Sequence, residues 1–383
     1  MVEWKKLGDF ADVQKTKNKK HITENAYSIT QAGLVPTKSF FKEKTHVTSS
    51  DTSGYYIVEK DWFVYSPSRI DVGSISYLKD EGPVIVSPID VVFSIDKKIC
   101  LPSYLLSYFF TYDGKKALLK NREGVEGMGR RNLPFDAIKT MYIPIPSLSE
   151  QTRIVGILDT FTASIDNLKE QIAERRKQYE HYRDQLLDLE GKEGVEMKTL
   201  GDVSDIKGEY GLSVPAKAFD GVRYIRITDI TDGGTLNNDC VSADYDVIEK
   251  EPLKDGDILF ARTGATVGKT LIYLKAYGEC LYAGYLIRYR VKHDIILPKY
   301  LFHFTHSNKY NKWIKSNLVE GAQPNINAQK YNSLSIPVPP LEEQSRIVSI
   351  LDTFEASIQN LEAQLKEREK QYEYYRNQLL TFE

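Results

Sequence analysis

Hydrophobic residues recur in steps of three and four along two long stretches of this chain, from Ile154 to Leu189 and from Ile347 to Phe382. Apolar positions at this spacing line one side of an α-helix, in the heptad pattern of helices that pair. We therefore predict two long helices with buried seams. The seam residues are Ile154, Leu158, Phe161, Ile165, Leu168 and Ile172 in the first helix, and Ile347, Leu351, Phe354, Ile358, Leu361 and Leu365 in the second.

The short segment after the first helix predicts how the two helices pair. Only Gly191, Lys192, Glu193 and Gly194 separate it from the next matched segment. These residues reach at most about 20 Å at roughly 3.4 Å each, whereas a helix of about 40 residues is roughly 60 Å long. A parallel pair would need the chain to return over that whole length. We therefore expect an antiparallel pair.

The two helices belong to a direct repeat. Residues 143–190 recur as residues 336–383 without a gap, with about two-thirds of the positions identical. The match also includes VEWKKLGD (Val2–Asp9) and VEMKTLGD (Val195–Asp202), while the bodies between the matched ends share little. We divide the chain into residues 1–146, 147–194, 195–339 and 340–383, as body, helix, body and helix.

Each body mixes short β-type segments with one helical stretch near its end. The predicted strands are residues 55–59, 62–66 and 84–95 in the first body, and residues 222–230, 256–261 and 285–291 in the second. Helices are predicted from residue 101 and over residues 296–318, both opened by LP-x-YL. The expected fold class is α+β: two similar mixed α/β domains separated by a pair of long antiparallel helices, with pseudo-two-fold symmetry.

Composition limits the functions that are open to the chain. A length of 383 residues with 41% hydrophobic and 27% charged residues is typical of a globular protein with room for two cores. A net charge of −2 argues against coating nucleic acid nonspecifically, but it allows a local basic face. The charged N-terminus and the lack of a long apolar run argue against secretion and membrane insertion. We therefore expect a cytoplasmic protein.

The cysteines and histidines do not predict a metal site. Cys100, Cys240 and Cys280 are widely spaced and odd in number, so we expect reduced core residues rather than a disulfide framework or a thiolate zinc site. His303 and His306 lie one helical turn apart, but the sequence offers no clear third ligand. Structural packing is the favoured interpretation of this pair.

Two further motifs resemble catalytic sites only weakly, one because its spacing is wrong and the other because its spacing is common in charged sequence. In TGATVGKT (Thr263–Thr270), three residues separate the glycines where a phosphate-binding loop needs four. Asp90, followed by Asp96, Lys97 and Lys98, only faintly resembles the carboxylate and lysine set of a nuclease. We therefore expect no catalytic residues in this chain.

The chain contains two IP-x-P…EQ-x-RIV-x-ILD segments, and it also contains FVYSPSRIDVGSI, GDILFARTGATVGKT and GAQPNIN. With these motifs it resembles, over its whole length, the specificity subunit of Type I restriction-modification enzymes. The resemblance implies two target recognition domains, each reading one half of a bipartite, asymmetric site in double-stranded DNA. It further implies that the helices set the spacing and dock two methyltransferase (modification) subunits, which restriction/translocase subunits join. S-adenosylmethionine, ATP and Mg are implied on those partners, with no cofactor on this chain.

Candidate DNA contacts lie in polar loops of both bodies. Arg, Gln and Asn make bidentate contacts to guanine and adenine edges, and residues 127–133 and 321–327 place such side chains before the last strand of each body. The DNA-binding candidates are Ser68, Arg69, Arg130, Arg131, Asn132, Arg262, Thr263, Lys269, Gln323 and Asn325. We expect some to bind phosphate and others base edges. An ordinary solvent-exposed loop is the alternative interpretation.

Two other classes of function compete with DNA recognition. A scaffold would use the two divergent bodies to bind two proteins, and it would show no salt-sensitive, sequence-dependent DNA binding. An independent enzyme would need a catalytic set, which the sequence does not contain.

Overall fold

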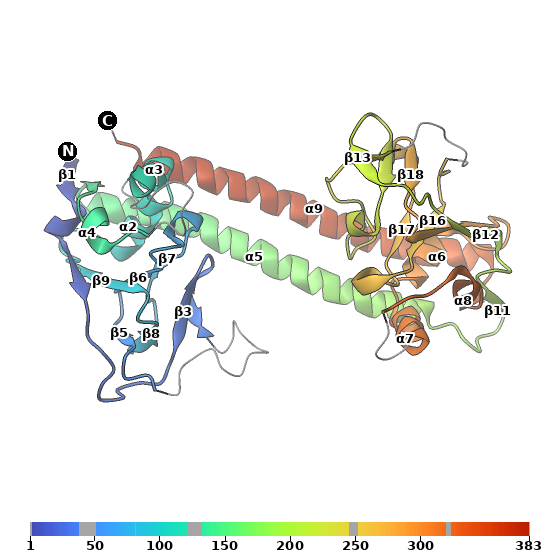
Figure 1. Ribbon diagram of the computed structural model, residues 1–383, viewed down its shortest axis with the longest axis horizontal. Coiled ribbons are helices and arrows are strands. Elements are labelled where there is room, and N and C mark those ends of the chain that lie inside the picture. Colours follow the sequence, from blue (N-terminus) through green and yellow to red (C-terminus); the bar gives the residue numbers. More distant parts are fainter. Residues whose placement is uncertain are drawn as a thin grey trace. The chain divides into compact units, whose positions relative to one another are not determined.

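The computed structural model describes residues 2–37, 51–80, 82–120, 132–244, 252–318 and 323–382. Contacts divide the chain into two compact units, Met1–Lys169 with Ala363–Glu383, and Glu170–Glu362. Each unit therefore contains one body together with part of each long helix (Figure 1). Among the described helices, none combines the length and the apolar character that crossing a membrane requires.

The first unit is built around a four-stranded antiparallel sheet with the strand order β2-β9-β6-β7. These strands are β2 (Ala11–Gln14), β9 (Val91–Ile95), β6 (Phe63–Tyr65) and β7 (Ile75–Tyr77). Two-stranded ladders join β1 (Glu3–Lys6) to β10 (Tyr142–Ile145), β3 (Tyr27–Thr30) to β4 (Gly33–Pro36), and β5 (Tyr56–Val58) to β8 (Val84–Val86). The body also contains α2 (Pro102–Phe109), α3 (Tyr112–Lys120), α4 (Phe135–Ile138), and the 3-10 turns η1 (Leu7–Asp9) and η2 (Ile70–Val72).

The second unit has a sheet of the same design, with the strand order β12-β19-β16-β17. These strands are β12 (Ser204–Tyr210), β19 (Leu286–Val291), β16 (Ile258–Ala261) and β17 (Thr270–Ile272). Ladders join β11 (Glu196–Thr199) to β20 (Ser335–Val338), β13 (Ala216–Ala218) to β15 (Val241–Ala243), and β14 (Arg223–Ile225) to β18 (Cys280–Tyr282). The body also contains α6 (Pro298–Phe304), α7 (Asn308–Asn317), α8 (Ala328–Asn332), η3 (Ile227–Asp229), η4 (Gly264–Thr266) and η5 (Lys275–Tyr277).

Strand register makes positions in the two central sheets equivalent. Tyr65 of β6 pairs with Val91 of β9, and Phe260 of β16 pairs with Ile287 of β19. Counting along the strands from these pairs assigns a counterpart in the second unit to each position of β6 and β9. The predicted duplication of one α+β fold is confirmed.

The long helices are α5 (Leu148–Leu187) and α9 (Leu341–Leu380), each of 40 residues. Within the second unit, Arg176 bonds to Glu362, and Tyr182 stacks on Phe354 with ring centroids 5.4 Å apart. Residue numbers therefore rise along α5 as they fall along α9 (Figure 1). The predicted antiparallel pairing is confirmed.

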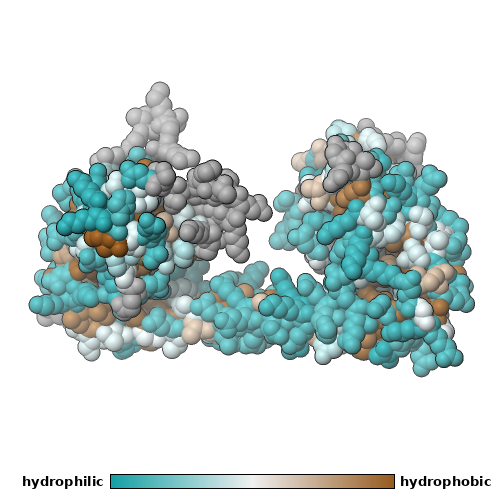
Figure 2. Space-filling view, turned by 90° about the horizontal axis from the view of Figure 1, so that it is seen from below, coloured by the Kyte–Doolittle hydropathy of each residue, from teal (hydrophilic) through white to brown (hydrophobic). Residues whose placement is uncertain are grey.

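The predicted seam residues face inward to different degrees. Seven of them are buried: Ile154, Leu158, Ile165, Leu168, Ile172, Ile347 and Leu351. The others, Phe161, Phe354, Ile358, Leu361 and Leu365, are half-buried. Arg175 lies over the Phe354 ring and Arg368 over the Phe161 ring, at 5.9 and 5.7 Å from the centroids, so each seam arginine covers an aromatic ring of the other helix. The surface of these helices visible in Figure 2 is mostly hydrophilic.

A buried glutamine attaches the start of α5 to the first body. The Gln151 side chain donates through Nε2 to the carbonyl oxygens of Ile99 and Pro146, both at 2.9 Å. Its Oε1 accepts from the backbone N–H of Leu101 at 2.8 Å. The side chain is fully buried, and these bonds satisfy both amide N–H groups. The glutamine of the EQ-x-RIV motif therefore has a structural role.

The second unit repeats this attachment with Gln344 at the start of α9. Its Nε2 donates to the carbonyl oxygens of Ile295 and Pro339, and its Oε1 accepts from the N–H of Leu297, at 2.8 to 2.9 Å. Gln344 is also fully buried. The same three bonds thus join helix and body in both units.

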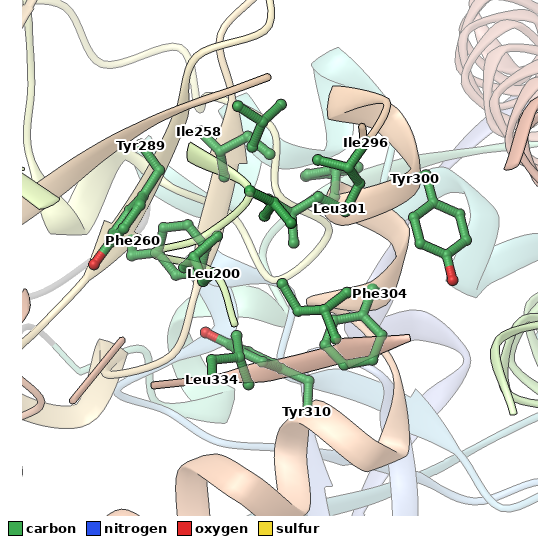
Figure 3. Packing of buried hydrophobic residues seen from close by; sticks show 14 of the residues in the cluster. Leu200, Ile258, Phe260, Tyr289, Ile296, Tyr300, Leu301, Phe304, Tyr310 and Leu334 are labelled. Carbon is green, nitrogen blue, oxygen red and sulfur yellow. The ribbon is translucent and has the colours of Figure 1, made fainter. Parts of the chain in front are cut away.

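The core of the second unit lies between its sheet and α6. Figure 3 shows Leu301 of α6 on the side of the cluster that faces Ile258 and Phe260 of the strands, with Tyr300 at its edge. Tyr300 is fully buried, and its hydroxyl donates to the Pro337 carbonyl oxygen at 2.8 Å. The LP-x-YL motif therefore contributes a core residue that also bonds to β20.

The single helix predicted over residues 296–318 is wrong, because two helices, α6 and α7, occupy this stretch. The hydroxyl groups of Thr305 and Ser307 donate to the carbonyls of Phe302 and Phe304 at the end of α6. Ser307 then accepts from the N–H of Tyr310 and caps α7. Local hydroxyl groups thus end one helix and begin the next.

Two predicted strands are also shorter than expected. Residues 84–95 form β8 and β9 instead of one strand, because Pro88 cannot donate a ladder bond and the N–H of Asp90 turns back to the Ser87 carbonyl. In residues 222–230 only β14 is a strand, and η3 follows it. The Asp229 carboxylate accepts from the N–H of Arg226 at 2.8 Å, which favours the turn.

Candidate nucleic-acid interface

In the second unit, the structure brings together two of the predicted DNA-binding loops. Thr263 and Asn325 form an isolated antiparallel bridge. On either side of it, the N–H of Ile326 donates to the Arg262 carbonyl at 2.9 Å, and the N–H of Gly264 donates to the Pro324 carbonyl at 3.0 Å. Gln323 and Asn325 are exposed, and Arg262 and Thr263 are half-buried. These four candidates therefore share one backbone-bonded surface.

Arg262 is held in place by its neighbours. Its guanidinium carbon lies 5.0 Å from the centroid of the Tyr210 ring, and the Tyr210 hydroxyl accepts from the N–H of Ala328 at 3.0 Å. The backbone N–H of Arg262 donates to the carbonyl of Tyr285, an exposed residue. Its Nε is buried without a hydrogen-bond partner in the described chain. The stacked, preoriented guanidinium suits planar, bidentate recognition.

Lys269 belongs to a different part of this loop. Its ammonium group bonds to Asp232 at 2.7 Å, and this hydrogen bond holds the pKa of Asp232 below its usual value. The segment Thr263–Thr270 connects β16 to β17 through η4. A phosphate-binding loop opens a helix instead, so the context agrees with the rejection of that motif. Lys269 is thus partly neutralised, unlike Arg262.

In the first unit, the described candidates lie on the matching loops. Ser68 is half-buried, and Arg69 and Asn132 are exposed. The N–H of Leu133 donates to the Pro67 carbonyl at 2.9 Å, in the same way that Ile326 bonds to Arg262. Arg130 and Arg131 lie outside the described residues.

The matching register shows where the two surfaces differ in chemistry. Pro67 is two residues beyond Tyr65, and Arg262 is two beyond Phe260, so the first unit has a proline where the second has a guanidinium. Asp90 immediately precedes Val91, and Leu286 immediately precedes Ile287, so the carboxylate of the first unit replaces a leucine. The two units therefore share a backbone frame, namely the central sheet and the bonded candidate loops. On this frame the positive charge of the second unit and the negative charge of the first occupy different positions.

Asp90 faces a cavity of about 470 Å³ between the candidate loops of the first unit. Pro67, Asn132 and Gln14 line the cavity with it. Asp90 is 8% exposed, and burial raises the pKa of its carboxyl to about 7. Within the described chain, no group donates a hydrogen bond to this carboxylate. The sequence pointed to Asp90 only as a weak nuclease candidate and gave no sign of its burial.

The faint nuclease set is not assembled. Lys97 forms an ion pair with Asp61 at 2.8 Å. The Asp96 carboxylate accepts from the backbone N–H of Lys98 at 2.9 Å. Neither lysine lines the cavity beside Asp90.

His303 has two carboxylates nearby that the sequence did not reveal. Its Nε2 lies 3.2 Å from Asp352, and its Nδ1 lies 3.7 Å from Glu355, both on α9. The ligand atoms of the three residues lie within 4.8 Å of one another, so the expectation that no third metal ligand is near His303 is wrong. Tyr179 already bonds to Glu355, and Lys299 to Asp352. The group is a hydrogen-bond network that joins α6 to both long helices.

His306 and the cysteines have simpler surroundings. Burial lowers the pKa of His306 to about 4, and its Nδ1 lies 2.9 Å from the Phe302 carbonyl. Cys100 and Cys280 are buried and free, as predicted, but Cys240 is exposed. The prediction that all three cysteines are core residues is therefore wrong for Cys240.

The central sheet of the second unit also contains buried charges. Asp257 is fully buried and accepts two bonds from Arg290 at 2.7 and 2.8 Å. Arg288, 1% exposed, lies 3.7 Å from Asp257 and also bonds to Glu209. At the register positions of Arg288 and Asp257, the first unit has Val92 and Trp62. Only the second unit therefore relies on ion pairs at these positions.

Comparison with known proteins identifies relatives of this chain. The model of the family described as "Type I restriction modification DNA specificity domain" matches residues 1–175 and 192–369. The specificity subunit of the type I restriction enzyme EcoR124I/EcoR124II of Escherichia coli is 34% identical over 263 residues, which are 63% of each chain. A type I restriction enzyme specificity subunit of Haemophilus influenzae is 32% identical over 274 residues, 67% of this chain and 68% of the relative. The matched part is thus about two-thirds of these relatives.

Solved structures share the fold over nearly the whole chain. One, from a study of complex assembly and conformational transition of the type I R-M system, has a TM-score of 0.62 at 18% identity and covers 99% of this chain and 96% of that one. The S subunit of a Type-I restriction-modification system from M. genitalium has a TM-score of 0.56 at 13% identity, covering 100% and 97%. At these identities the comparison shows a common fold.

Proposed function

Because the chain belongs to the family of type I restriction modification DNA specificity domains, we propose that it is the DNA sequence-recognition subunit of a Type I restriction-modification complex. Each body is a target recognition domain that reads one half of a bipartite, asymmetric site in double-stranded DNA. The paired helices α5 and α9 set the spacing between the halves and dock two methyltransferase subunits. Restriction/translocase subunits join that assembly, which acts in the cytoplasm.

One observation carries this proposal: a duplicated frame presents different chemistry at equivalent positions. The backbone bond from Leu133 to Pro67 recurs as the bond from Ile326 to Arg262, but a proline replaces an arginine. A shared frame supplies the same placement against a duplex, while the side chains select the bases. Two different surfaces on one frame are what a site with unequal halves requires.

The candidate residues divide by their chemistry. Arg262, Gln323 and Asn325 suit base edges, because their planar groups make bidentate bonds. Asn132 occupies the position of Asn325 in the first unit, one residue before the shared loop bond. Thr263, Ser68, Arg69 and Lys269 suit the phosphate backbone, and Lys269 must exchange Asp232 for a phosphate. Arg130 and Arg131 remain predicted DNA contacts.

The chemistry of modification and cleavage is assigned to partners. S-adenosylmethionine, ATP and Mg bind the methyltransferase and restriction subunits, and this chain is non-catalytic in the proposal. Its net charge of −2 supports this division, because a partner that adds phosphate contacts relieves the specificity subunit of that task.

The test is to map methylated bases, by long-read sequencing, in cells that express this chain with its methyltransferase subunit. We expect methylated adenines in a two-part motif with a fixed gap, absent without this chain. Exchanging residues 1–142 for the first body of another family member should then change one half of the motif. A stable complex that adds no methylation and binds DNA without sequence preference would favour a scaffold instead.

A further inference from the structure

The cavity beside Asp90 contains a carboxylate that lacks a partner. Burial of a charged group costs free energy unless hydrogen bonds replace its water. Asp90 is 8% exposed, and none of the described residues donates to its carboxylate. The other buried charged residues that the structure describes are paired, as Asp257 is with Arg290. Asp90 is thus an exception that requires an explanation.

We infer that Asp90 determines specificity in the first unit, by accepting a hydrogen bond from the exocyclic amino group of a cytosine or adenine in its half-site. The inference rests on the proposed function and deepens it, because it names the chemical class of group that this body reads. Asp90 then reads a base of the first half-site as an acceptor, whereas Arg262 is the proposed donor to a base of the second.

The position of the cavity supports this role. Pro67 and Asn132 line it: Pro67 accepts the backbone bond that unites the candidate loops, and Asn132 precedes Leu133, which donates it. Ile89, the residue before Asp90, is 76% exposed, and its counterpart Tyr285 is 57% exposed beside Arg262. In both units the strand therefore begins next to an exposed residue beside the candidate loops, and the first unit places a carboxylate there where the second has the buried Leu286.

The chemistry of DNA limits what this carboxylate can accept. In the major groove, only the N4 amino group of cytosine and the N6 amino group of adenine donate, whereas guanine and thymine present oxygen acceptors. Phosphates carry negative charge and repel the carboxylate. An unpaired acceptor thus rewards the two amino bases and rejects the other two, which is discrimination by both attraction and repulsion.

The protonation state gives this contact a pH dependence. Burial raises the pKa of Asp90 to about 7, so the charged form, which can only accept, prevails above that pH. Below it the carboxyl gains an O–H donor, which can also bond to guanine or thymine oxygens. Lys15 and Asp136 are the other charged side chains that line the cavity, and Asp136 pairs with Lys139. Discrimination by the first unit should therefore weaken as the pH falls from 8 to 6.

The experiment compares D90N with D136N in the full chain, assembled with its methyltransferase subunit. Both variants remove one carboxylate charge from the same cavity, but Asp136 is exposed and bonded to Lys139 at 2.5 Å. The readout is relative affinity across every single-base-pair variant of the mapped site. We expect D90N to lose about tenfold in discrimination at one base pair of one half-site, with the other half unchanged. D136N should match the wild type.

Four results would overturn the inference. If D90N discriminates as the wild type does, or changes affinity equally for all sequences, Asp90 does not read a base. If the wild-type complex recognises no bipartite site, the proposed function fails and the inference fails with it. The pH series on the wild type tests the same point without a variant. A discrimination at the first half-site that is constant from pH 6 to 8 counts against Asp90.

Discussion

The two units share a backbone frame, but they differ in where that frame carries charge. At the loop surface, the second unit has Arg262 where the first has Pro67, and the first unit has Asp90 where the second has Leu286. A donor has thus been placed at one position and an acceptor at another, on the same strand pairing. Polar specificity can therefore change without any change in the topology of the central sheet.

The interiors of the units differ in the same way. Asp257 and Arg288 of the second unit correspond to Trp62 and Val92 of the first. One sheet is held partly by buried ion pairs, and the other by apolar contacts at the same register. Five substitutions test where the units differ and where they agree, from the largest expected effect to the smallest.

Replacing Asp257 with Ala should destabilise the second unit alone. The change leaves Arg290 and Arg288 with less compensation in a buried sheet, which costs about 3–5 kcal/mol. Hydrogen exchange should show faster opening of β16 and β19, with β6 and β9 unaffected. Equal opening of both sheets would mean that the units do not unfold separately.

Replacing Gln151 or Gln344 with Ala should have nearly equal effects on the two units. Each glutamine makes the same three buried bonds between helix and body. Loss of either leaves buried backbone groups unpaired, at a cost of about 1–3 kcal/mol to its own unit. Hydrogen exchange at the backbone N–H groups of Leu101 and Leu297, measured at increasing urea concentration, gives the stability of each unit separately. A large effect in only one unit would contradict the shared attachment.

Replacing Arg262 with Ala should relax base selection in the second half-site. A bidentate contact to guanine contributes about tenfold or more in discrimination. Lys269→Ala is the matched control, because loss of a phosphate contact weakens all sequences alike and lowers the salt dependence. Affinities for single-base-pair variants at two salt concentrations separate the two patterns. A uniform loss with R262A would assign Arg262 to the backbone.

Replacing Asp90 with Asn should flatten the pH dependence of stability in the first unit. The pKa of Asp90 is raised to about 7 in the folded state from 3.8. The folded state therefore binds more protons between these values, and its stability falls as the pH rises from about 4 to 7. At pH 8, D90N should gain about 1 kcal/mol, because a neutral amide is less costly to bury than a charge. Thermal unfolding at pH 5 and 8 tests this, and a wild type whose stability rises over this range would contradict it.

The long helices were the most predictable part of the molecule. Their apolar positions recur in steps of three and four over some 35 residues. One atypical residue within such a long stretch does not obscure the helical periodicity. The short elements were less predictable. Nothing in the apolar pattern of residues 296–318 marks the break at Thr305 and Ser307, because it depends on side-chain hydroxyl groups that bond back to the chain.

The sequence identified the loops that form the candidate site, but not the contacts that their side chains make. Repeated position and side-chain type pointed to Arg262, Thr263 and Asn325, which the fold brings together. Stacking on Tyr210 joins residues 52 positions apart, and the burial of Asp90 results from loops that meet only in the folded unit. The sequence does show that the EQ-x-RIV motif, and with it the glutamine, occurs twice. It does not show that each glutamine makes three hydrogen bonds to backbone groups outside its helix.

The last residues of the chain belong to the first unit, where Leu380 is 1% exposed in the same hydrophobic cluster as Ile154 and Leu158. During synthesis, domains generally fold in order from the N-terminus. The first unit of this chain departs from that order, because it is discontinuous in sequence. The second unit is continuous from Glu170 to Glu362, so all of its residues are made before Ala363–Glu383. The first unit, although made earlier, must wait for Ala363–Glu383 to emerge, so a prematurely ended chain would damage the half that was translated first.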